Sequence, residues 1–115
     1  MYLRGRLKGQ MTQGDSPDWE PLELVLGDVL PGWFMWMFEV RLDNGLILNA
    51  YKHHQTRQYL HLSRDGSAFR FCGNDSYLHV DLAQSIQEAF PDREVERLPP
   101  EQRLALEKAL EEAQW

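Results

Sequence analysis

Residues 34–81 contain five short hydrophobic runs separated by turn-forming pairs, and this pattern constrains the fold more than any other part of the chain. The pairs are Asn44-Gly45, His54-Gln55, Asp65-Gly66 and Asn74-Asp75. Runs of aromatic, aliphatic and β-branched residues that are interrupted by such pairs are typical of β-hairpins. The segment from about 34 to 81 therefore predicts a five-stranded antiparallel β-meander.

The register of this sheet follows if each turn is treated as a two-residue hairpin loop. The four turns then pair Val40 with Asn49, Asn49 with Leu60, Leu60 with Phe71, and Phe71 with Leu78. Because cross-strand partners share a face, this register produces one apolar face. That face contains Trp36, Phe38, Val40, Leu42, Ile47, Tyr51, Leu60, Leu62, Phe69, Phe71, Leu78 and Val80. A three-residue loop at the second turn would swap the faces of every later strand.

Apolar residues at helical spacing flank the predicted sheet on both sides. The stripe in residues 19–30 predicts an N-terminal helix that ends at Pro31, and residues 82–90 predict a helix capped by Asp81. Residues 94–98 are expected to be extended, and residues 100–114 predict a last helix. We therefore predict an α+β fold in which the apolar face of the sheet packs against helices 19–30 and 82–90. Helix 100–114 is then peripheral, faces a partner, or covers the other face of the sheet.

Length and composition favour one domain. The chain has 115 residues, of which 43% are hydrophobic, and we assign residues 19–115 to a single α+β domain. Residues 1–18 form a basic and polar segment that predicts a flexible N-terminal arm, with an edge strand as the alternative for residues 1–10. There is no signal-peptide pattern and no apolar run that could span a bilayer, and Cys72 is the only cysteine. These features favour a cytoplasmic protein that does not contact membranes.

The second face of the predicted sheet has an unusual composition for a solvated surface. Its candidate ligand- or partner-binding residues are Arg41, Leu48, Lys52, Arg57, Tyr59, His61, Arg70, Tyr77 and His79. Tyrosine and arginine are enriched in protein interfaces, and the apolar part of this face needs a cover. The sequence therefore favours a small, non-enzymatic binding or regulatory domain that works through contacts of this face with a protein partner or with a second copy in a homodimer.

Two other functions use the same residues. Tyr59, His61, Arg70, Tyr77 and His79 combine stacking platforms with cations, which is the mixture that RNA or a small anionic ligand requires. The net charge of −6 argues mildly against a dedicated nucleic-acid binder. A small enzyme that uses His61, His79 and Cys72 is the third hypothesis. The histidine spacing does not predict a metal site, and no motif for a cofactor is present.

Overall fold

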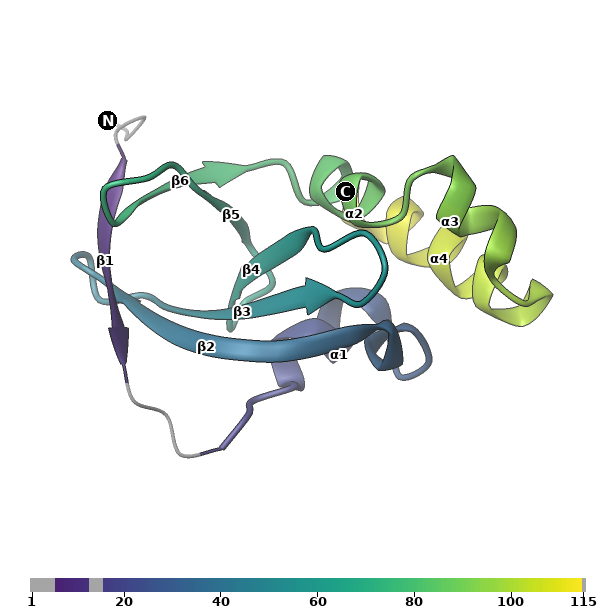
Figure 1. The fold of residues 1–115 in the computed structure, drawn as a ribbon, viewed down its shortest axis with the longest axis horizontal. Coiled ribbons are helices and arrows are strands. Elements are labelled where there is room, and N and C mark those ends of the chain that lie inside the picture. Colours follow the sequence, from purple (N-terminus) through teal and green to yellow (C-terminus); the bar gives the residue numbers. More distant parts are fainter. Residues whose placement is uncertain (1–5, 13–15, 115) are drawn as a thin grey trace.

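Six antiparallel strands close into a barrel in the order β1-β2-β3-β4-β5-β6, and helices pack against its outer surface (Figure 1). The structure is a computed structural model, and it describes residues 6–12 and 16–114. The strands are β1 (Leu7–Thr12), β2 (Phe34–Leu42), β3 (Ile47–His53), β4 (Tyr59–Ser63), β5 (Ala68–Phe71) and β6 (Ser76–Val80). The helices are α1 (Glu20–Leu26), the 3₁₀ helix η1 (Leu30–Trp33), α2 (Leu82–Ala89), α3 (Asp92–Arg97) and α4 (Pro100–Ala113).

The α+β class and the antiparallel sheet are confirmed, but the prediction of a five-stranded meander is wrong. The sixth strand, β1, comes from the segment that was assigned to the N-terminal arm. It pairs with β2 through Gly9 and Leu42 and with β6 through Leu7 and Tyr77, so it closes the barrel. Expectations for residues 1–5 and 13–15 lie outside the described residues.

The first, third and fourth hairpins have three-residue loops instead of the two-residue loops that the sequence suggested. Leu42 donates its amide to Leu46, Ser63 to Ser67 and Cys72 to Ser76. The first two of these loops end in glycines with positive φ, Gly45 at 92° and Gly66 at 88°. A three-residue loop has one residue more than the predicted two-residue loop. Each extra residue shifts the pairing of the following strand with the preceding strand by one position.

The second hairpin differs in another way, because its loop has four residues. His53 donates its amide to the carbonyl of Gln58, which pairs Asn49 with Leu62 instead of Leu60. A shift by two positions leaves every side chain on its predicted face. A bulge between Trp36 and Phe38 makes one further change, since it places these two aromatic side chains on opposite faces of β2.

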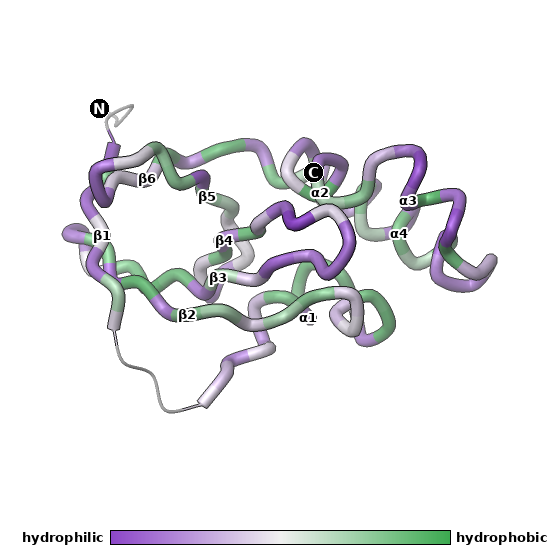
Figure 2. Tube along the Cα trace, viewed as in Figure 1, coloured by the Kyte–Doolittle hydropathy of each residue, from purple (hydrophilic) through white to green (hydrophobic). Residues whose placement is uncertain are grey.

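These shifts split the predicted apolar face into two separate clusters. The outer cluster lies between the sheet and the helices; it retains Trp36, Tyr51, Leu60, Leu62 and Val80 and includes Ala68. The inner cluster fills part of the barrel and contains Phe38, Val40, Leu42, Leu48, Phe69, Tyr77 and Leu7. Apolar residues recur along the strands and on α1, as Figure 2 shows. The prediction of one apolar face and one polar face is therefore wrong, because both faces of the sheet are buried.

Helices form within the three segments where they were predicted, residues 19–30, 82–90 and 100–114, and one additional helix forms where an extended segment was predicted. Asp81 caps α2 by accepting a hydrogen bond from the Gln84 amide at 3.0 Å, and α4 has the expected range. The N-terminal helix is shorter than predicted, because it ends at Leu26 before Gly27, whose φ is 81°, and Pro31 lies within η1 instead of ending the helix. Residues 94–98 were predicted to be extended, but most of them form α3, whose N-cap is Pro91. Within the described residues, no helix is long and apolar enough to cross a membrane.

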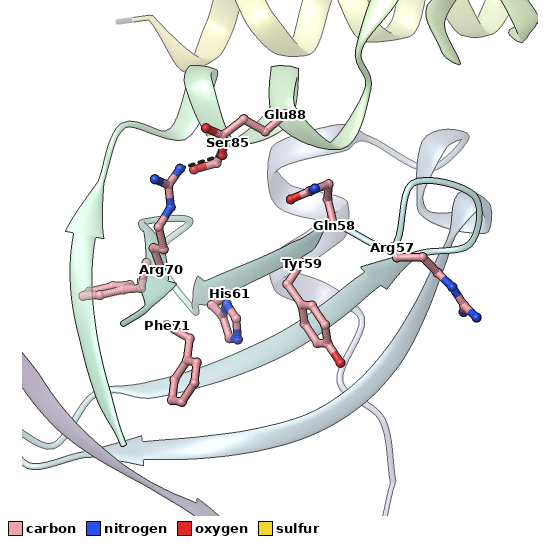
Figure 3. Close-up of a pocket in the computed structure, with 9 residues that line it drawn as sticks. Arg57, Gln58, Tyr59, His61, Arg70, Phe71, Ser85 and Glu88 are labelled. Carbon is pink, nitrogen blue, oxygen red and sulfur yellow. Dashed lines mark hydrogen bonds and ion pairs between the residues drawn. The ribbon is translucent and has the colours of Figure 1, made fainter. Parts of the chain in front are cut away.

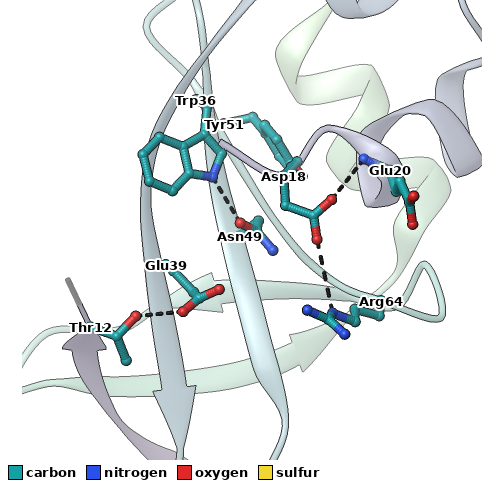
Figure 4. A network of polar contacts seen from close by, with 8 residues as sticks. All are labelled: Thr12, Asp18, Glu20, Trp36, Glu39, Asn49, Tyr51 and Arg64. Atoms are coloured by element: carbon teal, nitrogen blue, oxygen red, sulfur yellow. Dashed lines mark hydrogen bonds and ion pairs between the residues drawn. The ribbon is translucent and has the colours of Figure 1, made fainter. Parts of the chain in front are cut away.

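A set of polar contacts attaches the segment before α1 to the outside of the barrel (Figure 4). Tyr51 donates its hydroxyl to the carbonyl of Asp18, and burial raises the pKa of this tyrosine. The Asp18 carboxylate accepts a hydrogen bond from the Glu20 amide and lies 3.9 Å from Arg64 of the β4–β5 turn. Trp36 Nε1 donates to Asn49 Oδ1 at 2.8 Å. The contacts of Asp18 hold the segment before α1 against β3 and the β4–β5 turn.

Candidate ligand-binding cleft

The barrel wall opens between β4 and β5. The ladder between these strands consists of His61 with Phe69 and Leu62 with Ala68, and it stops before Tyr59 reaches Phe71. Backbone groups alternate in direction along a strand, and Ser63 already donates to Ser67 of the neighbouring loop. The backbone N–H and C=O groups of Tyr59 and Phe71 therefore face the opening, where the next pair of the ladder would be.

Two cavities meet at this opening, and together we call them the barrel cleft (Figure 3). The first has a volume of about 550 Å³, extends toward α2, and is lined by Arg57, Gln58, Tyr59, His61, Phe69, Arg70, Phe71, Ser85 and Glu88. The second has a volume of about 350 Å³, lies at the mouth of the barrel, and is lined by Gly9, Met11, Phe38, Val40, Tyr59, His61, Phe71, Asp75 and Tyr77. Both volumes are typical of small-molecule sites.

Three aromatic side chains, Tyr59, His61 and Phe71, line both cavities. The rings of Tyr59 and His61 are nearly parallel, at 12°, with centroids 5.4 Å apart, and Tyr77 meets His61 edge-on at 5.3 Å. Tyr59 is 38% exposed and Phe71 is 49% exposed. Large aromatic side chains are seldom left this open beside a cavity, and their faces offer platforms on which a planar group stacks.

His61 is the polar group at the centre of the cleft. It comes from β4, pairs with Ala50 and Phe69 across the sheet, and is only 5% exposed. Desolvation alone lowers its pKa to about 4, with no contribution from a hydrogen bond to another described residue. The imidazole is therefore neutral at pH 7 and offers one donor and one acceptor, which the described part of the protein does not use.

Charge is distributed unevenly along the cleft. At the α2 end, an Arg70 guanidinium nitrogen lies 2.6 Å from the Glu88 carboxylate, and Arg57 adds a second cation at the edge. Lys52 Nζ lies 5.7 Å from the centroid of the Tyr59 ring. Among the described residues that line the mouth cavity, Asp75 is the only charged one. The α2 end thus contains an ion pair, Arg57 adds a cation at the opposite edge of that cavity, and the mouth is mainly apolar.

The structure brings together most of the candidate residues, although the predicted register is wrong. Arg57, Tyr59, His61, Arg70 and Tyr77 line the cleft, and Lys52 lies beside it. The remaining candidates are elsewhere. Leu48 is fully buried in the inner cluster, Arg41 lines a separate groove near Lys8, and His79 is exposed, 5.2 Å from the ring of Phe69.

The residues of the enzyme hypothesis are not assembled in the cleft. Cys72 and His79 are absent from the lining of both cavities, and Cys72 Sγ lies 3.5 Å from the carbonyl oxygen of Arg70. Among the described residues, no group of three or more His, Cys, Asp or Glu side chains is placed to hold a metal ion. The cleft instead offers stacking surfaces, one neutral imidazole and an ion pair.

Several cleft residues were missed by the sequence analysis. Phe38 and Phe71 were assigned to the opposite face, while Met11, Ser85 and Glu88 were placed outside the sheet altogether. The signal for Phe71 was the glycine at the end of the Asp65-Gly66 turn, since a three-residue loop uses a glycine there, whereas Phe38 changes face because of the bulge in β2. Nothing in the sequence indicated that Met11 or α2 would reach the same cavity.

Comparisons of the chain with protein-family models, curated proteins and solved structures find no significant match. The cleft is therefore interpreted from its own geometry and chemistry.

Proposed function

We propose that the protein is a non-enzymatic binding protein for a small molecule that places a planar ring in the barrel cleft. The observation that carries this proposal is His61, which is 5% exposed, neutral, lacks a hydrogen bond from its imidazole to other described residues, and faces two cavities that meet at its ring. The ring nitrogens of His61 are open to the cleft, so a polar group of a ligand that enters the cleft can pair with them.

The surroundings of His61 define the kind of ligand. The side chains of Tyr59 and Phe71 are partly exposed beside the cleft and favour an aromatic ring, and the imidazole favours a ring whose edge carries a hydrogen-bond donor or acceptor. Phe38 and Val40 line the apolar end of the cleft. A planar heterocycle of the size of a nucleobase or an indole meets these requirements within the volume of the cleft.

A role in protein contacts or self-association, which the sequence favours, stays a prediction. The second face of the sheet forms the barrel interior, so most of it is too enclosed to meet a flat partner surface. Such a contact would have to use the exposed rim around Met11, Tyr59 and Phe71. The cleft geometry favours a small ligand over this alternative, because its polar group is at the bottom of a cavity.

Titration of ¹⁵N-labelled protein with adenine, and separately with indole, tests the proposal by NMR. We expect shifts in the amide signals of Tyr59, His61 and Phe71 that saturate at millimolar or lower concentration. Tyr59→Ala and His61→Phe should weaken binding, by about tenfold for a lost stacking partner or a lost buried hydrogen bond. His54→Ala, at an exposed histidine outside the cleft, is the control and should have no effect.

Two results would contradict the proposal. One is the absence of saturable shifts at the cleft with either ring. The other is tight binding of a single-stranded RNA oligomer that exceeds binding of its mononucleotide by orders of magnitude and decreases steeply with salt. That result would assign the cleft to nucleic acid instead of a small ligand.

A further inference from the structure

We infer that the ligand carries an anionic group, and that this group takes the place of the Glu88 carboxylate on Arg70 at the α2 end of the cleft. The inference rests on the proposed function, because it concerns the same ligand and adds the chemistry of its second group. It also fixes the orientation of the ligand, with the planar ring at His61 and the anion toward α2.

The orientation follows from the charges along the cleft. The α2 end has the guanidinium of Arg70, paired with the carboxylate of Glu88, and Arg57 is an exposed cation at the opposite edge of the same cavity. The mouth cavity has only the carboxylate of Asp75 among its lining residues. An anion is therefore attracted to the α2 end and repelled from the mouth.

The Arg70–Glu88 ion pair is suited to replacement of Glu88 by an anionic group of a ligand. Arg70 and Glu88 side chains are 49% and 42% exposed, and the pair is made by one guanidinium nitrogen and one carboxylate oxygen. Exposed ion pairs contribute little to stability, so separating this pair costs little. The guanidinium has five N–H donors in a planar fork, which binds a carboxylate or a phosphate through two parallel hydrogen bonds. A ligand that uses this fork makes a stronger contact than Glu88 does.

The position of Arg70 on β5 places it in the same cavity as His61. It lies between Phe69 and Phe71 on β5, and all three residues line the α2 cavity together with His61. Figure 3 shows its guanidinium directed toward Glu88 on α2, while Phe71 and His61 point toward the barrel interior. A ring stacked beside His61 and an anion on Arg70 therefore fit within one continuous cavity of about 550 Å³.

The experiment compares probes that differ only in the anion: adenosine with AMP for a phosphate, and indole with indole-3-acetate for a carboxylate. Dissociation constants are measured by NMR or calorimetry for the wild type, Arg70→Gln and Glu88→Gln, with Arg41→Gln as the control at an exposed arginine outside the cleft. Thermal unfolding verifies that each variant is folded.

We expect the anionic member of at least one pair to bind about tenfold or more tightly than its neutral counterpart. Arg70→Gln should remove this difference, and Glu88→Gln should strengthen anion binding by up to about fivefold, since the competing carboxylate is gone. Arg41→Gln should change neither value. A preference confined to AMP identifies the anion as a phosphate, and one confined to indole-3-acetate identifies it as a carboxylate.

Three results would overturn the inference. Equal binding of neutral and anionic probes, still dependent on Tyr59, would remove the anion and leave the proposed function intact. Weaker anion binding by Glu88→Gln would mean that Glu88 contacts the ligand directly instead of competing with it. Failure of all four probes to bind would refute the proposed function, and this inference with it.

Discussion

Burial of His61 makes the stability of the protein sensitive to acid. The imidazole has an ordinary pKa of 6.5 in the unfolded chain, and burial lowers its pKa to about 4 in the folded protein. Above pH 6.5 both states are neutral and His61 has no effect on the pH dependence. Between pH 6.5 and about 4 only the unfolded state takes up the proton, so the free energy of unfolding falls as the pH is lowered.

The magnitude follows from the width of that interval. At about 1.4 kcal/mol per pH unit, the loss amounts to roughly 3 kcal/mol by pH 4, a large part of the stability of a small domain. Urea unfolding from pH 8 to pH 4, followed by circular dichroism, measures this loss. The non-titrating variant His61→Phe should lack the contribution of His61 to this loss. The difference in the free energy of unfolding between the variant and the wild type should therefore change by roughly 3 kcal/mol between pH 6.5 and pH 4.

His53 also contributes to the total loss, which is why the comparison with a variant is needed. His53 is fully buried, its pKa is also lowered by burial, and its Nδ1 accepts hydrogen bonds from the amides of Gln55 and Thr56. Parallel curves for the wild type and His61→Phe would refute the assignment of His61 as a buried, neutral imidazole.

Two further predictions concern the barrel and its core. Gly9→Ala should lower stability by about 1–3 kcal/mol, because a Cβ at this position would lie 2.6 Å from Val40 Cγ1 and push β1 off the barrel. Gly32→Ala, where the same atom meets open space, should be nearly neutral, and equal effects of the two variants would contradict the close approach of β1. Leu62→Ala should cost about 2–5 kcal/mol in urea unfolding because the side chain is fully buried. Leu104→Ala, at a side chain that is 66% exposed, should change stability by less than about 0.5 kcal/mol, and a comparable loss in both would refute the assignment of the outer core.

The sequence predicts the elements of this fold better than their connections. Five strands, the capped helix α2 and the last helix were found from periodicity and turn residues, since these signals are local. The strand β1 was only the alternative to a flexible arm, because Gly5 and Gly9 interrupt a short, weakly alternating segment. Its partners Leu42 and Tyr77 are far away in the sequence, and no local pattern indicates such pairing.

The faces of the sheet were mispredicted for a related reason. An alternating pattern reveals register only when one face is buried and the other is wet. Here the helices cover the outside and the barrel encloses the inside, so Leu60 and Phe69 are both buried, although they point to opposite sides. The assignment of side chains to the two faces depends on whether a hairpin loop has two or three residues, and an Asp-Gly pair occurs in both loop types. The candidate residues still meet, because Tyr59, His61 and Tyr77 share one side in either register.

Closure by β1 has a consequence for how the chain acquires its shape. β1 is the first strand to leave the ribosome and β6 is the last, and the pairing of Leu7 with Tyr77 joins them. Contacts between residues so distant in sequence form slowly. Until β1 takes its place, β2 and β6 each present an unpaired edge on which other chains can assemble. The barrel is therefore most vulnerable to aggregation in the interval between the synthesis of β6 and the docking of β1.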